Sequence, residues 1–407
     1  MRIVIADFAG HPFQIQLSRE LAKRGHTLLH LYSSEFLTPK GRLSVGPGDP
    51  TTLTVEPVTL GKTFAKYSYV RRRFQEIAIG KAMAARCHAF DADIVVGSNL
   101  PLETLRVVSR ECRNAARPFV LWQQDIFSIA IERILTDKFG LFGAMLGRYY
   151  KFVESHVVLK SQSVVTISSD FVAALRDALG VTGDHIHVVE NWAPLDEILP
   201  RPKDNPWSRA HGLADKQVVL YTGTLGMKHN PRHILAAAEA LRSRSDTVVV
   251  VASEGQAAKW LMEQARAQDM PSLRVVGFQP FSDYPNVLGS ADVLISILEK
   301  DSGVFSVPSK VLSYLCASRA IVLSAPPDNL ASRIIQTSEA GKAIPAGDFE
   351  GFANAIISYL DDPALRDRAA LNGRKYAEKT FDIQAIGDRF EAILTNARSK
   401  ITGLHGP

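Results

Sequence analysis

Two glycine-containing loops in the second half of the 407-residue chain carry lysines that suit phosphate binding. The first loop, residues 221–231, begins at the end of a strand and turns at Gly223. Lys228 follows the turn, and Asn230 and Pro231 favour the start of a helix. Backbone N–H groups at a helix N-terminus bind anions, and Lys228 adds a full positive charge beside them. The loop lacks the spacing of a P-loop or a dinucleotide fingerprint, which disfavours ATP hydrolysis and hydride transfer. An ordinary strand-to-helix turn with a solvated lysine is the alternative.

The second loop, residues 299–312, also follows an apolar stretch and enters a helix, which Ser309 can cap. Around Gly303 the backbone N–H groups are available to a diphosphate, Lys310 supplies a charge, and Asp301 can accept hydrogen bonds from sugar hydroxyls. A surface turn that merely reverses the chain is the alternative. Because both loops follow parallel strands of one predicted domain, we expect them to form a single anion site.

Two further loops of the same domain could line this site. Residues 252–255 end another strand, and residues 276–280 could present Phe278 to a nucleobase, although a phenylalanine there is more often a core residue. The expected donor-binding residues are Gly223, Thr224, Glu254, Gly255, Phe278, Ser302, Gly303, Val304, Ser309 and Ser313.

The first half of the chain offers polar residues where its strands end. Gly10 allows close approach after the first strand, and His11 follows it. Asn99 and Asp125 come at the ends of two further strands. Loops at strand ends are where substrate contacts belong, so these four residues are the expected acceptor-side contacts. A purely structural role for a lone histidine or aspartate is the alternative.

Both halves alternate short apolar runs with helical patterns. The runs cover residues 2–7, 27–33, 93–99, 118–124, 163–168 and 186–191, and then 218–223, 247–253, 273–278, 292–298 and 320–325. Runs that are apolar on both faces indicate parallel sheets covered by helices on both sides. The sequence therefore predicts an α/β protein with two Rossmann-like, doubly wound parallel-sheet domains facing a central cleft.

Four prolines among charged residues separate the two halves, a composition that favours neither strand nor helix. After residue 348 the pattern is helical to the end of the chain. We expect an N-terminal acceptor domain of residues 1–192, a linker of residues 193–217, a C-terminal nucleotide-sugar domain of residues 218–381, and a final helix in residues 382–407 that packs back across the hinge.

Composition fits a folded protein of a reducing compartment. The chain is 46% hydrophobic and 22% charged, and its three cysteines show neither disulfide nor zinc spacing, which favours the cytoplasm and no metal. The first residues predict a strand rather than a signal peptide, and no apolar run approaches the ~20 residues that span a bilayer.

The net charge of +5 is ordinary for a solvated surface, but its distribution is uneven. Seven basic residues lie between positions 62 and 86, interleaved with aromatic and aliphatic ones. Such a segment could rest on an anionic membrane surface, or it could be a solvated helix that covers the first domain. No basic stripe with regularly spaced aromatics lines the predicted cleft, which disfavours nucleic-acid binding.

Taken together, these segments resemble the retaining family 4 glycosyltransferases of GT-B fold, in particular the bacterial exopolysaccharide, colanic acid and O-antigen type. The resemblance covers nearly the whole chain. It is carried by Gly10-His11-Pro12 with residues 16–26, Trp122-Gln123-Gln124-Asp125, residues 223–231, Ala291-Asp292-Val293 and residues 307–315.

The resemblance implies a nucleotide-diphosphate sugar, such as a UDP- or GDP-sugar, in the C-terminal domain and a saccharide or lipid-linked acceptor in the N-terminal domain. It also implies retention of anomeric configuration without an obligatory metal or cofactor, in a cytoplasmic protein that could bind the inner face of the membrane peripherally. The residues that we expect to act in the reaction are Lys228, Lys310, Asp301, His11 and Asp125.

Three positions depart from the family pattern. The arginine that usually follows the first-loop glycine is Thr224 here, and Lys310 could supply the missing charge. Of the family's two glutamates, Asp301 can stand for the first, whereas Ser309 or Ser313 falls where the second is expected. These departures keep two alternatives open: a nucleotide-sugar 2-epimerase of the same fold, and a non-catalytic glycosyltransferase-like partner.

Overall fold

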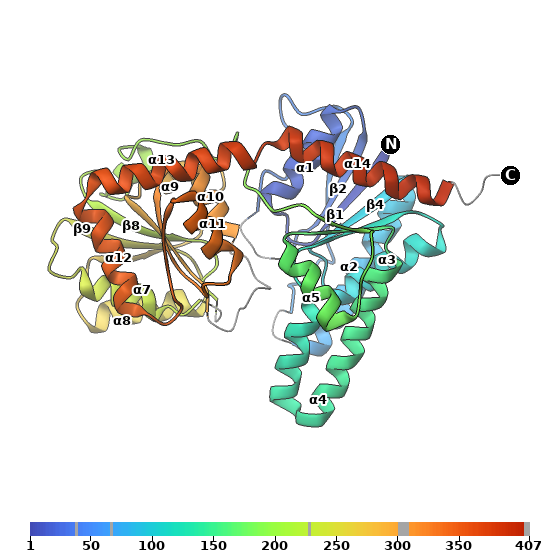
Figure 1. The fold of residues 1–407 in the computed structure, drawn as a ribbon, viewed down its shortest axis with the longest axis horizontal. Helices are drawn as coiled ribbons and strands as arrows, with labels where there is room; N and C mark the ends of the chain where they lie inside the picture. Colours follow the sequence, from blue (N-terminus) through green and yellow to red (C-terminus); the bar gives the residue numbers. More distant parts are fainter. Residues whose placement is uncertain (37–39, 66–67, 227–228, 300–308, 403–407) are drawn as a thin grey trace. The chain divides into compact units, whose positions relative to one another are not determined.

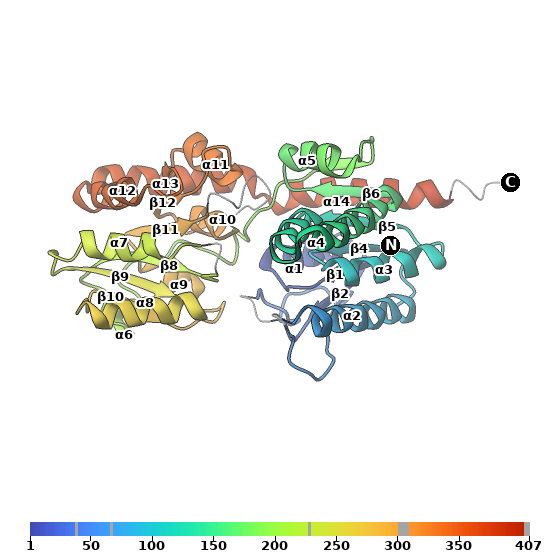
Figure 2. The same ribbon diagram turned by 90° about the horizontal axis from the view of Figure 1, so that it is seen from below.

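The computed structural model describes residues 1–36, 40–65, 68–226, 229–299 and 309–402. The chain forms two compact units: Met1–Glu190 with Ile383–Pro407, and Asn191–Asp382. We describe each unit by itself (Figures 1 and 2). No helix in the described part of the chain has the length and apolar character needed to span a bilayer.

The first unit is built on a seven-stranded parallel sheet of order β3-β2-β1-β4-β5-β6-β7. At its centre, Ile3 of β1 lies in register between Leu28 of β2 and Ile94 of β4. Its strands are β1 (Arg2–Asp7), β2 (Thr27–Ser33), β3 (Leu53–Val58), β4 (Ile94–Ser98), β5 (Phe119–Gln123), β6 (Ser163–Thr166) and β7 (Ile186–Val188). Every residue of β4, β5 and β6 is buried, as the apolar runs predict.

The helices of this unit are α1 (Pro12–Lys23), α2 (Tyr69–Ala89), α3 (Leu102–Asn114), α4 (Phe127–Lys160), α5 (Ser169–Leu179) and α14 (Ile383–Thr402). The helices α2 and α3 pack side by side, and α14 packs against α1 although more than 350 residues separate them in sequence. Arg24 at the end of α1 forms ion pairs with Asp388 (2.6 Å) and Glu391 (3.0 Å) of α14, and the Phe390 ring packs 4.7 Å from Trp122 of β5.

The helix α4 is a hairpin of two arms rather than one straight rod, as Figure 1 shows. Its helical geometry breaks at Gly140, where φ is 55° and ψ is −132°. Glycines let the arms approach closely: a Cβ atom on Gly143 would lie 1.9 Å from the Leu135 carbonyl oxygen, and one on Gly147 would lie 2.6 Å from the Glu132 side chain. The hairpin therefore depends on residues without side chains at its internal contact.

The second unit holds a six-stranded parallel sheet of order β10-β9-β8-β11-β12-β13. Its strands are β8 (Gln217–Thr222), β9 (Thr247–Ala252), β10 (Leu273–Val276), β11 (Val293–Ile297), β12 (Ala320–Ser324) and β13 (Gly341–Ile344). Its helices are α6 (Pro206–Ala210), α7 (Arg232–Ala240), α8 (Gln256–Ala267), α9 (Tyr284–Gly289), α10 (Ser309–Cys316), α11 (Leu330–Ser338), α12 (Phe349–Asp361) and α13 (Pro363–Thr380). Two parallel-sheet α/β domains confirm the predicted fold class.

Three elements differ from the sequence expectation. No apolar run in the sequence predicted the strands β3 and β13. Both are edge strands with partly exposed residues. Residues 206–210, in the proline-rich stretch, form α6 because Asn205 and Ser208 make a reciprocal capping box at its start. Local hydrogen bonds here outweigh an unfavourable composition.

Candidate functional site

The carboxyl ends of four adjacent strands in the second unit bring the expected donor loops together. The order β10-β9-β8-β11 places the carboxyl ends of these strands side by side. Gly223 follows β8 with a φ of 91°, and Gly255 follows β9 with a φ of 102°, conformations that favour glycine. The Phe278 N–H donates a 3.1 Å hydrogen bond to the Glu254 carboxylate, which joins the loop after β10 to the loop after β9.

Lys310 reaches this edge from the first turn of α10. Its ammonium nitrogen donates to the Tyr221 hydroxyl, lies 3.8 Å from the centre of the Tyr221 ring, and is 3.5 Å from the Thr224 carbonyl oxygen. The Tyr221 hydroxyl in turn donates to the same carbonyl at 2.9 Å. Lys310 therefore lies beside the Gly223 turn, as the single-site interpretation requires: its side-chain carbon Cε is 3.7 Å from the position of a Cβ on Gly223.

The electrostatic environment of Lys310 is unusual for a lysine. Burial lowers its pKa from 10.5 to about 7, and no carboxylate among the described residues forms an ion pair with it. A partly buried lysine that no described carboxylate neutralises is poised to gain its full charge when an anion binds. This arrangement can bind a phosphate group next to the β8 turn.

A network of hydroxyl groups supports the turn from behind. The Thr222 N–H donates to the Tyr314 hydroxyl at 3.0 Å, and the Thr222 hydroxyl lies 3.1 Å from those of Tyr284 and Tyr314. Ser313 hydrogen-bonds to Tyr284 and so belongs to this network, whereas Ser309 is exposed at the start of α10. The network fixes the end of β8 relative to α10, and with it the position of Lys310.

A pocket of about 580 Å³ opens beside this edge. It lies at the starts of α7 and α8 and is lined mainly by apolar surface, with Pro231, Trp260 and Glu299 among its residues. Its volume is that of a small-molecule site. The sequence did not predict Trp260 as a pocket residue, because a tryptophan inside a helical pattern gives no sign of which face of the helix it occupies. A large aromatic residue close to a strand-end loop was the one feature that could have pointed to it.

Several expected site residues lie outside the described part of the chain. These are Lys228 of the first loop and Asp301, Ser302, Gly303 and Val304 of the second.

In the first unit, the expected acceptor-side residues follow three neighbouring strands. His11, Asn99 and Asp125 come after β1, β4 and β5, which are adjacent in the sheet. Gly10 has a φ of 77°, and a Cβ on it would meet Leu43 at 2.6 Å. Burial lowers the pKa of His11 to about 4, so its imidazole is neutral at pH 7 and can accept a proton or a hydrogen bond.

Sequence reasoning passed over Asp7, the buried carboxylate that shapes the His11 turn. Asp7 accepts hydrogen bonds from the backbone N–H groups of Ala9 (2.9 Å) and His11 (3.1 Å). With its amide turned so that the nitrogen faces Asp7, Gln14 donates to both Asp7 oxygens at 2.9 Å. Burial raises the pKa of Asp7 to about 7, against these hydrogen bonds, which lower it. The sequence feature that could have pointed to Asp7 is an acidic residue at the end of an otherwise apolar first strand.

A second buried carboxylate, Glu154, lies below the Asp125 turn. It accepts hydrogen bonds from the backbone N–H groups of Phe127 (3.2 Å) and Ser128 (2.9 Å) and from the side chain of Gln123 (2.9 Å). Burial raises its pKa to about 7. Because Glu154 belongs to the second arm of α4 and caps the first, it joins the hairpin to the end of β5.

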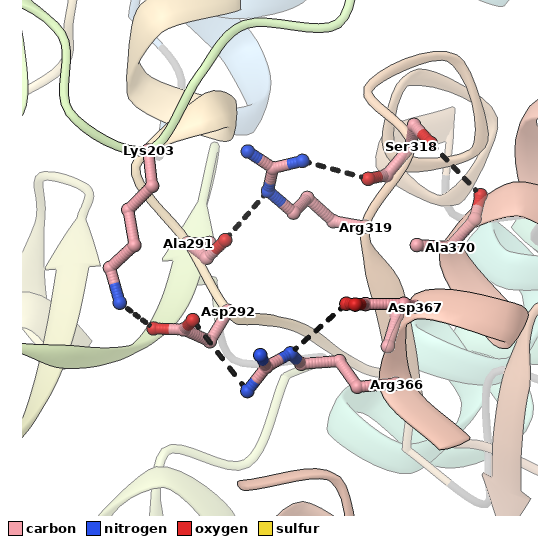
Figure 3. Close-up of a pocket in the computed structure, with 9 residues that line it drawn as sticks. Lys203, Ala291, Asp292, Ser318, Arg319, Arg366, Asp367 and Ala370 are labelled. Carbon is pink, nitrogen blue, oxygen red and sulfur yellow. Dashed lines mark hydrogen bonds and ion pairs between the residues drawn. The ribbon is translucent and has the colours of Figure 1, made fainter. Parts of the chain in front are cut away.

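The pocket in Figure 3 lies at the opposite, amino-terminal edge of the second sheet and has about 240 Å³. Asp292, just before β11, accepts the Val218 N–H at 2.7 Å and pairs with Lys203 and with Arg366, 3.7 Å away. Arg319 donates to the Ala291 carbonyl at 2.7 Å. These side chains satisfy one another and hold residues near position 203 against the unit, which is a structural role.

The described residues contain no cluster of histidine, cysteine, aspartate or glutamate that could hold a metal ion.

Comparison with known proteins agrees with this geometry. Residues 216–362, which include the loops after β8, β9 and β10 and the start of α10, match the family described as glycosyl transferases group 1. The alpha-D-kanosaminyltransferase of Streptomyces kanamyceticus is 23% identical over 62% of this chain and 65% of its own length. A glycogen synthase of Mycobacterium tuberculosis (strain CDC 1551 / Oshkosh) is 26% identical over 61% of this chain and 57% of its own.

A protein of Escherichia coli (strain K12) named for a glycosyl transferase of colanic acid biosynthesis, WcaI, is 20% identical over 52% of each chain. The chain thus spans roughly half to two thirds of the length of these curated relatives. Among solved structures, Anabaena Alr3699/HepE, crystallised with UDP and glucose, superposes with a TM-score of 0.71 over 97% of this chain and 99% of that one, at 16% identity. The chain therefore has the GT-B fold, and residues 216–362 of its second unit match the model of the glycosyl transferases group 1 family.

Proposed function

We propose that the protein is a glycosyltransferase that moves a sugar from a nucleotide-diphosphate sugar to a saccharide or lipid-linked saccharide. The observation that carries this proposal is Lys310, which lies beside the Gly223 turn within the region that matches the family and pairs with no carboxylate in the part of the chain that the structure describes. Departure of a nucleoside diphosphate develops negative charge, and a preorganised cation at that point stabilises it. Lys228 and Asp301 complete the proposed donor contacts.

The finer proposal is a retaining, family 4-like reaction in cell-surface polysaccharide biosynthesis, at the cytoplasmic face of the membrane and without an obligatory metal. The neighbour bound to UDP and glucose supports a UDP-sugar as donor, and the colanic acid relative supports the pathway class. The glycogen synthase relative keeps storage-type α-glucan acceptors among those to test. On the acceptor side, neutral His11 and the Asp125 turn are the proposed contacts.

Donor binding is tested by thermal shift with UDP-, GDP- and ADP-sugars, since a ligand that binds only the folded state raises the melting temperature. The variant Lys310→Met should abolish the shift, and Lys379→Met, an exposed lysine of α13, is the matched control. A full shift with Lys310→Met would remove Lys310 from the donor site. No shift with any nucleotide sugar would favour the non-catalytic alternative.

The reaction is tested by incubating the protein with the bound nucleotide sugar, with and without candidate acceptors. We expect a glycoside with the donor's anomeric configuration in the NMR spectrum, and product only when an acceptor is present. Epimerised nucleotide sugar in the absence of acceptor would instead identify a 2-epimerase. An inverted product would retain the transferase proposal and overturn the family 4-like mechanism.

A further inference from the structure

The outer face of the α4 hairpin exposes a row of large apolar side chains. Leu141 at the tip is 88% exposed, and along the second arm Phe142 (70%), Met145 (68%), Tyr149 (40%) and Phe152 (69%) follow at spacings of three and four residues. That spacing places the last four on one face of a helix. Apolar groups gathered in this way mark interaction surfaces rather than ordinary solvent-facing helices.

The first turn of α2 adds to this surface. Tyr69 (55% exposed), Val70 (68%) and Phe74 (66%) are all directed to solvent. The Lys138 ammonium of the hairpin lies 5.2 Å from the centre of the Tyr69 ring and 5.6 Å from that of Phe139, which is itself 49% exposed. The start of α2 and the tip of the hairpin are therefore neighbours.

Buried polar contacts hold these two elements together. Glu103 of α3 is buried, with 3% of its surface exposed. It forms an ion pair with Arg73 of α2 at 2.9 Å and accepts a hydrogen bond from the Tyr150 hydroxyl of the second arm at 3.4 Å. The packed glycines of the hairpin fix the inward side of its arms. The exposed apolar side chains thus stand on a preformed support.

The charges around these side chains are mainly positive. Between positions 133 and 152 the bases are Arg133, Lys138, Arg148 and Lys151, and the acid is Asp137. Lys151 pairs with Glu132 at 2.5 Å, and α2 contributes Arg71 together with Arg72 and Arg73, which pair with Glu76 and Glu103. A second copy of the chain would bring like charges together, whereas the headgroups of an anionic bilayer would complement them.

We propose that the hairpin tip and the first turn of α2 form one docking surface for an anionic lipid bilayer. The docking surface consists of Tyr69, Val70, Phe74, Phe139, Leu141, Phe142, Met145, Tyr149 and Phe152. Its apolar side chains enter the boundary between headgroups and acyl chains, and the surrounding bases contact lipid phosphates. The hairpin is thus the main anchor, whereas the sequence had pointed only to residues 62–86.

This inference rests on the membrane-associated part of the proposed function, but its test needs neither donor nor acceptor. Its failure would leave the transferase proposal standing, and failure of donor binding would leave the docking surface standing.

The test is sedimentation of the full chain with vesicles of phosphatidylcholine, alone or mixed with phosphatidylglycerol. We expect binding to the mixed vesicles that weakens as salt is raised. The triple variant Leu141→Ser, Phe142→Ser, Met145→Ser should lower the bound fraction at least about tenfold, since it removes most of the apolar area at the tip. The control triple Leu199→Ser, Met262→Ser, Leu371→Ser removes exposed apolar residues of the second unit and should bind normally.

The double variant Lys138→Glu, Arg148→Glu separates the electrostatic contribution to binding from the apolar one. We expect it to abolish the preference for phosphatidylglycerol. All these positions are exposed, so circular dichroism and the melting temperature should match those of the original protein. Binding that survives the tip triple would overturn the proposal. So would a failure to sediment with mixed vesicles combined with a dimer that the tip triple dissociates, which would assign the surface to a second copy.

Discussion

At the scale of single residues, the candidate site depends on groups whose protonation burial has shifted. Lys310 is held against the Tyr221 ring by desolvated surroundings, and its pKa of about 7 leaves it partly neutral in the absence of ligand. A phosphate beside it would favour the charged form and raise that pKa again. Binding of a nucleotide sugar should therefore be coupled to proton uptake.

We predict that affinity for a nucleotide sugar falls as pH rises above about 7. Below that value Lys310 is already charged; above it, binding must add a proton, which weakens affinity by at most about tenfold per pH unit. A nucleotide sugar is the right probe because its esterified diphosphate does not titrate near neutral pH. Calorimetry in two buffers of different ionisation enthalpy measures the proton uptake directly, and the control variant Lys379→Met should keep it. Affinity that is flat across this range in the original protein would contradict the role of Lys310.

A second prediction concerns the buried carboxylate Glu154. Its pKa in the folded state, about 7, lies above its ordinary value of 4.5, so unfolding between these values releases a proton. Stability should therefore fall as pH rises through this window, by at most about 1.4 kcal/mol per pH unit from this group. Urea unfolding of Glu154→Gln, which stays neutral but keeps an acceptor oxygen, should show a shallower fall. Asp7 should retain part of the slope, because its pKa is raised in the same direction. An unchanged slope in Glu154→Gln would show that Glu154 is ionised throughout.

At the scale of elements, the two arms of α4 depend on glycine at their contact. A Cβ at position 143 would lie 1.9 Å from the Leu135 carbonyl, far inside van der Waals contact, so a side chain there must separate the arms. The exposed apolar row sits on the outer side of the same arms. The shape of the docking surface therefore depends on Gly143 and Gly147, which lie at the contact between the arms and not on the surface itself.

We predict that Gly143→Ala loosens the hairpin, at a cost of about 1–3 kcal/mol, and weakens binding to anionic vesicles. Hydrogen exchange should rise in residues 127–160 and stay unchanged in the second unit. Thr136→Ala, an exposed position on the first arm, is the matched control and should leave exchange as it is. Unchanged exchange in Gly143→Ala would show that the arms do not pack as described.

At the scale of the whole molecule, the last helix ties the two ends of the sequence together. The helix α14 follows the second unit in the chain but completes the first, where Phe390 is fully buried against Trp122 and Arg24 pairs with two acids. The first unit therefore cannot be obtained by cutting the chain at residue 190.

We predict that Phe390→Ala destabilises the first unit by about 3–5 kcal/mol, the usual cost of emptying a buried phenylalanine site. Thermal unfolding followed by hydrogen exchange should show the loss in residues 1–190 and leave the second unit unchanged. Leu371→Ala, which is half exposed on α13, serves as the control and should cost far less. Equal losses in both units would mean that they unfold as one.

The sequence by itself determined the fold class, and it predicted the loops of the proposed donor site. Apolar runs of both sheets match the buried central strands closely, because a strand covered on both faces must be apolar at every position. The sequence did not predict the edge strands β3 and β13, because a partly exposed strand need not be apolar at every position. The sequence predicted Lys310, Gly223 and Phe278 as donor contacts because glycine turns and lysines at strand ends have a local chemical meaning.

Only the tertiary structure decided which of these groups meet and in what state. It placed Lys310 against Tyr221, gave Asp7 and Glu154 their roles as buried caps, and put the exposed faces of α4 and α2 side by side. Burial, pKa and surface exposure arise from contacts between segments far apart in sequence. No local pattern in the sequence contains them.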